Sequence, residues 1–138
     1  DGEEKQKLKK SINEKKLNNV IYLLGKVDNV IRYMKDSHAF ILSSKWEEMG
    51  FVIIEAALSN LFIISSNCPN GPSEFLNYGI GGILFESNQK DALYESLVKY
   101  NQITDKVKFT NKIQTKKNSI NFTMFRHFKI LNKILSQK

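Results

Sequence analysis

Several residue types that would narrow the function are scarce in this chain of 138 residues. Cys68 is the single cysteine, so no internal disulfide can form, and this composition is typical of a reducing compartment. We expect Cys68 to be a small core or loop thiol. The two histidines, His38 and His127, do not stand at metal-ligand spacing from Cys68. The sequence therefore predicts no bound metal.

Long hydrophobic runs are also absent. None approaches the roughly 18 residues that a membrane-spanning helix needs, and no signal peptide precedes the first predicted helix. The opening "DGEEKQKLKK" lacks Met and begins within a helical pattern, so we expect a fragment of a longer protein. A content of 41% hydrophobic and 25% charged residues is typical of a globular domain, here with enough chain for one core.

Charge is unevenly distributed along the chain. Residues 1–104 carry 12 basic and 13 acidic side chains, whereas residues 105–138 carry nine basic and one acidic. This basic C-terminal helical segment suggests an anionic partner, either nucleic acid or the cytoplasmic face of a membrane. A solvated helix face explains it equally well. Nucleic acid is the weaker partner, because the tail has no aromatic stacking platform.

The hydrophobic pattern switches repeatedly between helical and strand periods. It predicts helices over 3–17, 29–37, 50–59 and 88–102, a short helix within 70–79, and strands over 19–25, 39–44, 61–66 and 81–85. The basic tail should end in an amphipathic helix with apolar positions at Ile120, Phe122, Phe125, Phe128, Ile130 and Ile134. Short apolar strands alternating with helices predict an α/β fold, a Rossmann-like doubly wound parallel sheet with helices on both faces. Residues 1–138 should form one domain.

The stretch "SSKWEEMGFVIIEAALSN" raises the question of function, because carboxylates interrupt an apolar run. Ser44 and Glu47 fit a capping box, and Glu47 and Glu48 would favour the positive end of a helix dipole. Glu55 should share a helix face with Phe51 and Leu58, where its carboxylate needs hydrogen-bond donors. Ligand hydroxyls or an internal partner could supply them, and the residues alone leave both open.

The separation of the two carboxylates bears on the reaction class. Eight residues of one helix would place Glu47 and Glu55 about 12 Å apart. Glycosidase pairs lie closer together, so a two-carboxylate hydrolase is disfavoured. In a doubly wound sheet, a phosphate-bearing ligand should lie beyond the carboxyl ends of the strands, against helix N-termini.

Glu47-x7-Glu55 in this setting resembles the signature of the retaining glycosyltransferases of group 1 (family 4), which have the two-domain GT-B fold. The similarity extends to "VIYLLGKVDNV", "SHAFILSS", "NLFIISSNCPNGPSEFLNYGIGGILF" and the closing "FTMFRHFKILNKIL". It covers the C-terminal, donor-binding half only. The acceptor half, and a first strand with basic residues that grip the diphosphate, would be missing.

The resemblance implies roles for particular residues. Glu47 would stabilise charge at the anomeric carbon, and Glu55 would accept hydrogen bonds from the ribose hydroxyls. Backbone N–H groups around Gly50, Phe51 and Val52 would face the sugar and phosphates. The base would lie against Val27 and Asn29.

Some positions depart from the family's pattern. Where the family has Glu-Gly-Phe-Gly, this chain has Glu47-Glu48-Met49-Gly50, and Met49 replaces an aromatic residue in the sugar pocket. Asn67 stands where Asp is common. Glu74 matches a family acid, but Pro72 and Glu74 also fit the ordinary start of a helix.

The sequence thus predicts the donor half of a metal-independent hexosyltransferase without a cofactor, inactive in isolation. It would take a sugar from a nucleotide-diphosphate sugar and pass it to a carbohydrate or lipid-linked acceptor, as in surface polysaccharide or lipopolysaccharide biosynthesis. The expected location is cytoplasmic, peripheral on the inner face of the membrane. A non-catalytic module that binds membrane or nucleic acid through its basic tail is the alternative. A nucleotide-sugar epimerase of the same architecture has a different signature.

Overall fold

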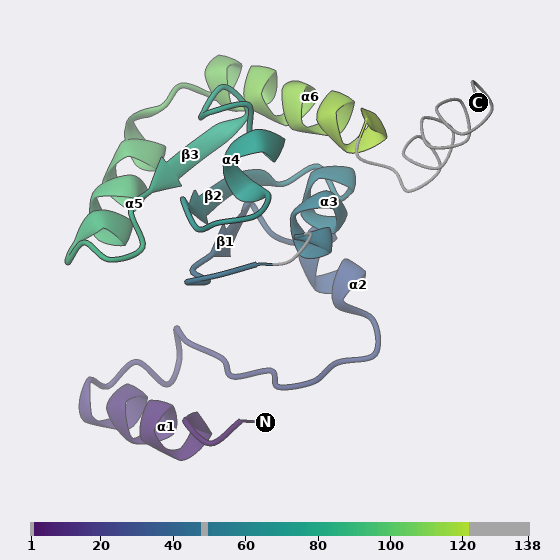
Figure 1. Ribbon diagram of the computed structural model, residues 1–138. Helices are drawn as coiled ribbons and strands as arrows, with labels where there is room; N and C mark the ends of the chain where they lie inside the picture. The colour runs from purple at the N-terminus through teal and green to yellow at the C-terminus, as the bar shows by residue number, and fades with distance from the viewer. Residues whose placement is uncertain (1, 48–49, 122–138) are drawn as a thin grey trace, which may run out of the picture. The chain divides into compact units, whose positions relative to one another are not determined.

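The structure, a computed structural model, describes residues 2–47 and 50–121 (Figure 1). The chain divides into two compact units, Asp1–Val30 and Ile31–Lys138. Each unit is treated by itself below.

The first unit begins with α1 (Lys5–Glu14), which is shorter than the predicted helix over 3–17. It buries none of its residues. Two ion pairs lie along its surface, Lys7 to Glu4 at 2.9 Å and Lys10 to Glu14 at 3.8 Å. Exposed pairs of this kind add little stability, so α1 depends on its local backbone hydrogen bonds.

The predicted strand over 19–25 is wrong. This segment pairs with no strand among the described residues, and Val20, Tyr22 and Leu24 are exposed. A strand requires a neighbour for its N–H and C=O groups, and apolar composition alone does not supply one. The segment therefore shows neither the predicted pairing nor the predicted burial.

The second unit contains the sheet. Its elements are α2 (Val30–Lys35), β1 (Ala39–Leu42), α3 (Phe51–Leu58), β2 (Phe62–Ser66), α4 (Pro72–Phe75), β3 (Gly82–Phe85), α5 (Ala92–Gln102) and α6 (Asp105–Asn121). The strands are parallel in the order β1-β2-β3. The predicted α/β fold is therefore confirmed, and α2 to α5 and the three strands lie within a few residues of their expected ranges. The helix α6 lies within the segment 105–138 that was expected to be helical. The tail's positions from Phe122 to Ile134 lie outside the described residues.

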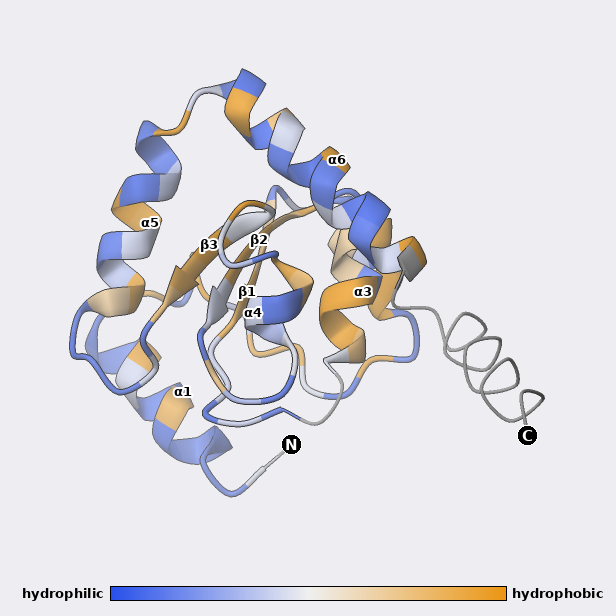
Figure 2. Ribbon diagram, turned by 45° about the horizontal axis from the view of Figure 1, so that its top comes forward, coloured by the Kyte–Doolittle hydropathy of each residue, from blue (hydrophilic) through white to orange (hydrophobic). Residues whose placement is uncertain are grey.

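The core has two layers because helices cover both faces of the sheet (Figure 2). Ile63 of β2 packs in a cluster with Ile53, Ala56 and Ala57 of α3. Its neighbours in β2 point to the other face, where Phe62 contacts Tyr100 of α5 with the two rings tilted by 53° and their centroids 5.0 Å apart. All five residues of β2 are buried, as expected for a central parallel strand.

The α6 helix packs against α3, α4, β2 and β3 through small polar residues. Thr115 and Ser119 are buried there, and their hydroxyls donate to backbone carbonyls of α6 itself. The Asn118 side chain donates to the carbonyl of Phe75 at 2.7 Å. The apolar residues Phe109 and Ile120 of α6 are instead exposed. This helix therefore presents apolar and basic side chains outward.

Gly82 leaves no room for a side chain between β2 and β3. A Cβ atom there would fall on the carbonyl oxygen of Ile63, its partner in β2. We expect Gly82→Ala to lower the free energy of unfolding by about 1–3 kcal/mol, because main-chain atoms of the sheet must move. Urea denaturation measures this. At Gly2 a Cβ would meet nothing within 4 Å, so Gly2→Ala is the control. Equal stability of the two variants would contradict the prediction.

Candidate functional site

The carboxyl ends of the three parallel strands meet at one edge of the sheet, where doubly wound folds bind their ligands. Ser44, Asn67 and Glu86 follow β1, β2 and β3, respectively, at this edge. The hydroxyl of Ser66, the last residue of β2, donates to the carbonyl of Ser44 at 2.6 Å. This bond holds the start of the loop after β1 against the central strand.

A second set of bonds joins the ends of β2 and β3. The Asn67 backbone N–H donates to the carbonyl of Phe85 at 2.7 Å, and its side-chain amide donates to Glu86 Oε1 at 3.0 Å. Asn67 is a departure from the family pattern in the sequence, and Glu86 is not among the predicted site residues. Glu86 directly follows an apolar strand, as Asn67 does, and this position in the sequence could have identified it as a site residue.

Glu47 lies in the loop between β1 and α3, and its side chain is half-buried. The predicted capping box is wrong, because α3 begins at Phe51 and its N-cap is Gly50. Gly50 has φ +56°, in the left-handed region that glycine adopts without strain, and no side chain caps the helix. Glu47 therefore precedes the helix rather than occupying its first turn. Glu48 and Met49 lie outside the described residues.

This start also changes the geometry of the carboxylates. The estimate of about 12 Å between Glu47 and Glu55 does not apply, because it assumed one continuous helix. Glu47 precedes α3 and Glu55 lies within it, so the two carboxylates do not stand on one helix.

The N–H groups of Phe51 and Val52 stand in the first turn of α3, where amides have no carbonyl one turn earlier in the helix to bond. They are donors with the positive end of a helix dipole behind them, suited to an anionic group. That these amides face the sugar and phosphates of a donor stays a prediction.

Glu55 is exposed, contrary to the expectation of an acid in a wholly apolar environment. Phe51 and Leu58 on the same stripe of α3 are 52% and 56% exposed, whereas Ile53, Ala56 and Ala57 form the buried face. The carboxylate faces solvent, and no described residue forms an ion pair with it. The exposed side chain is accessible to a ligand. Because the carboxylate is not buried, it does not require a ligand to supply hydrogen-bond donors.

Val27 and Asn29 belong to the other compact unit. Val27 is half-buried and Asn29 is exposed. Their predicted place beside the base therefore stays a prediction.

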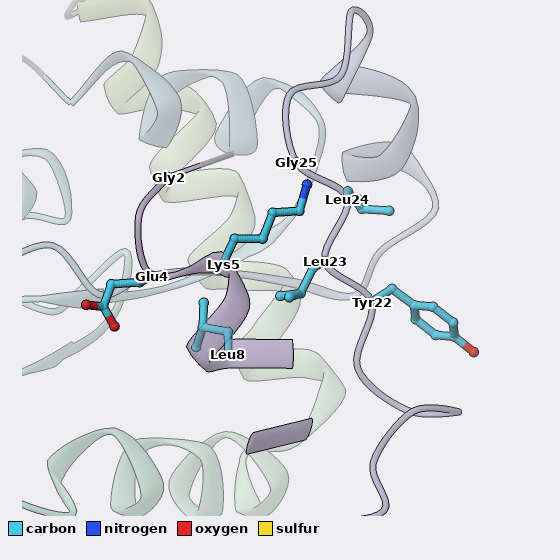
Figure 3. Close-up of a pocket in the computed structure, with 8 residues that line it drawn as sticks. All are labelled: Gly2, Glu4, Lys5, Leu8, Tyr22, Leu23, Leu24 and Gly25. Carbon is cyan, nitrogen blue, oxygen red and sulfur yellow. The ribbon is translucent and has the colours of Figure 1, made fainter. Parts of the chain in front are cut away.

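That unit contains an apolar cavity of about 490 Å³ between the start of α1 and residues 22–25 (Figure 3). Leu8, Leu23 and Leu24 line it, and Lys5 extends toward Gly25. None of the predicted site residues lines this cavity, so it does not bear on the proposed donor site.

Cys68 is a buried free thiol, 3% exposed, as expected for a core or loop cysteine. Glu74 stands in the first turn of α4 after Pro72, which is the predicted helix-start chemistry. Within residues 2–47 and 50–121, no three His, Cys, Asp or Glu side chains converge as a metal site requires. No helix in the same residues has the length and apolarity to cross a membrane.

The class of fold is clear from solved structures that resemble the chain. Anabaena Alr3699/HepE, solved in complex with UDP, matches with a TM-score of 0.81 and 20% identity over 96% of this chain and 36% of that one. TarM matches with a TM-score of 0.79 and 25% identity over 98% of this chain and 26% of that one. Both share the α/β, Rossmann-like arrangement.

Sequence comparison then identifies the family. The family described as "Glycosyl transferases group 1" matches residues 1–113, so the chain belongs to the group 1 glycosyltransferases. A glycosyltransferase of Methanocaldococcus jannaschii is 36% identical over 70% of this chain. The poly(ribitol-phosphate) α-N-acetylglucosaminyltransferase of Staphylococcus aureus is 24% identical over 71% of it. The chain spans 27% and 20% of these two relatives, respectively.

Ser66→Ala tests whether the β2 hydroxyl positions the loop after β1. Loss of a buried hydrogen bond should lower the free energy of unfolding by about 1 kcal/mol, and amide hydrogens of residues 43–47 should exchange faster. Chemical denaturation and hydrogen exchange measure the two effects. Ser43→Ala removes an exposed hydroxyl in the same loop and is the control. Unchanged exchange in Ser66→Ala would contradict this role.

Proposed function

We propose that this chain is the C-terminal, donor-binding half of a retaining GT-B glycosyltransferase of family 4. The observation that carries the proposal is the half-buried Glu47, which lies in the loop leading from the carboxyl end of β1 into the uncapped N-terminus of α3. Together they offer a carboxylate and free amide donors at the edge where such folds bind ligands. Because the chain spans only part of its relatives, the activity belongs to the whole protein.

The donor is a nucleotide-diphosphate sugar, and the transferred group is a hexose or hexosamine. A neighbour solved with UDP supports a nucleotide ligand. Relatives named as N-acetylglucosaminyl- and galactosyltransferases support the sugar class. The phosphates meet the amides of Gly50, Phe51 and Val52, Met49 borders the sugar, and Val27 and Asn29 contact the base.

In the reaction, the acceptor hydroxyl attacks the anomeric carbon on the face from which the nucleoside diphosphate leaves. The developing oxocarbenium-like charge is stabilised by the Glu47 carboxylate, while the α3 amides offset charge on the departing phosphates. This division of roles requires neither a cofactor nor a metal ion. Glu55 accepts hydrogen bonds from the ribose hydroxyls, and its exposure on α3 leaves the carboxylate available for them.

The acceptor is a carbohydrate or lipid-linked molecule of a surface polysaccharide or lipopolysaccharide pathway, bound by a domain outside this chain. Relatives named for a diphosphoundecaprenol acceptor and for capsular polysaccharide biosynthesis support this class. The enzyme works in the cytoplasm at the inner face of the membrane. The outward-facing apolar and basic residues of α6, including Phe109, Ile113 and Lys116, support a peripheral contact with anionic lipid. Membership of the family disfavours a purely non-catalytic module.

Glu47→Gln in the full-length enzyme keeps the side-chain size but removes the charge. We expect kcat to fall about 10²–10³-fold, because a preorganised stabilising charge is lost in the transition state. Steady-state transfer from the preferred nucleotide sugar measures this. The exposed Glu95 on α5 supplies the matched control, Glu95→Gln, which should keep its kcat. Wild-type kcat in Glu47→Gln would remove Glu47 from the mechanism.

Glu55→Gln should act on donor binding rather than on chemistry. Weaker hydrogen bonds to the ribose should raise the donor KM about tenfold, with kcat nearly unchanged. Comparison of KM for ribonucleotide and 2′-deoxyribonucleotide donors checks the assignment, since the variant should lose its preference for the ribonucleotide. If both proteins discriminate equally, Glu55 does not contact the ribose.

A further inference from the structure

A second cavity of about 400 Å³ lies at the opposite, amino-terminal edge of the sheet. Its lining includes His38, which directly precedes β1, and Asn60, which shortly precedes β2. Strands of four or five residues put this edge roughly 13–17 Å from the carboxyl edge. The cavity is therefore separate from the proposed donor site. Its size falls within the range of about 300–1,000 Å³ common for small-molecule pockets.

Two half-buried lysines converge on this cavity. Lys108 and Lys112 stand one turn apart on α6, so their side chains share a face. Lys108 Nζ lies 4.2 Å from the centre of the Tyr100 ring, a cation–π contact that orients the ammonium group. No described carboxylate forms an ion pair with either lysine. Ammonium groups that are partly removed from water and form no ion pair favour an anionic ligand.

The remaining lining residues restrict which anion fits. Asp105 also borders the cavity and would repel a bare anion, but its carboxylate accepts hydrogen bonds from hydroxyl groups. Asn60 can both donate and accept. Tyr100 and Phe109 add aromatic surface, against which the C–H faces of a sugar can pack. One molecule that carries a phosphate group for the lysines and hydroxyl groups for Asp105 and Asn60 would match this lining.

We propose that this cavity binds a phosphorylated sugar, with the phosphate on Lys108 and Lys112 and the sugar hydroxyls on Asp105 and Asn60. Compact ammonium groups bind phosphate as point charges. A ligand at this edge contacts none of the residues proposed to bind the donor substrate.

Two-dimensional NMR titration of the chain with glucose 1-phosphate tests this site. The amide chemical shifts of Asn60, Lys108 and Lys112 should change. Glucose 1-phosphate should bind at least about tenfold more tightly than inorganic phosphate or glucose alone, because its phosphate and its sugar hydroxyls use separate contacts. Lys108→Gln/Lys112→Gln should weaken binding about tenfold.

The matched control is Lys116→Gln/Lys117→Gln, which makes the same charge change on exposed residues of α6. It should bind glucose 1-phosphate as the parent chain does, and so should Glu55→Gln at the donor edge. Inorganic phosphate binding as tightly as glucose 1-phosphate would overturn the proposal. Equal weakening by both lysine pairs, or shifts confined to the loop holding Glu47, would also overturn it. The Glu55 control keeps this outcome distinct from a failure of the glycosyltransferase assignment.

Discussion

Parallel pairing of β2 with a strand on each side is the constraint on which the rest of the sheet-bearing unit depends. The β2 backbone bonds to β1 and β3, and its side chains alternate between Ile63 on the α3 face and Phe62 and Ile64 on the α5 face. Ser66 at its end holds the loop after β1, and Asn67 holds the end of β3. The central strand thereby aligns the loops of the candidate site.

The aligned loops place groups that can bind a ligand at the carboxyl edge of the sheet. The glycine turn at Gly50 lets the chain enter α3 without a side-chain cap, so first-turn amides remain available beside the Glu47 loop. A Ser or Asp at the N-cap would have stabilised the helix but satisfied those donors internally. The helix therefore lacks a local stabilising interaction at the place where an anionic ligand can supply one.

Much of the fold could be predicted from periodicity, because buried parallel strands and amphipathic helices have distinct apolar patterns. The strands at 39–44, 61–66 and 81–85 were found on that basis. The segment 19–25 has an equally apolar pattern but is not a strand, because pairing is a property of two segments. For the same reason, the capping box predicted at Ser44 failed, since a glycine in a left-handed conformation later in the chain determines where α3 begins.

By itself the sequence determined the α/β alternation, the family, and the identity of the acids at Glu47 and Glu55. Tertiary structure alone decided that Glu55 faces solvent, that Glu86 bonds to Asn67, and that two lysines of α6 share a cavity with His38. Periodicity reports how residues repeat along one element, so it identifies elements and motifs. Exposure and convergence depend on which elements pack together, and that is set by contacts between residues far apart in the chain.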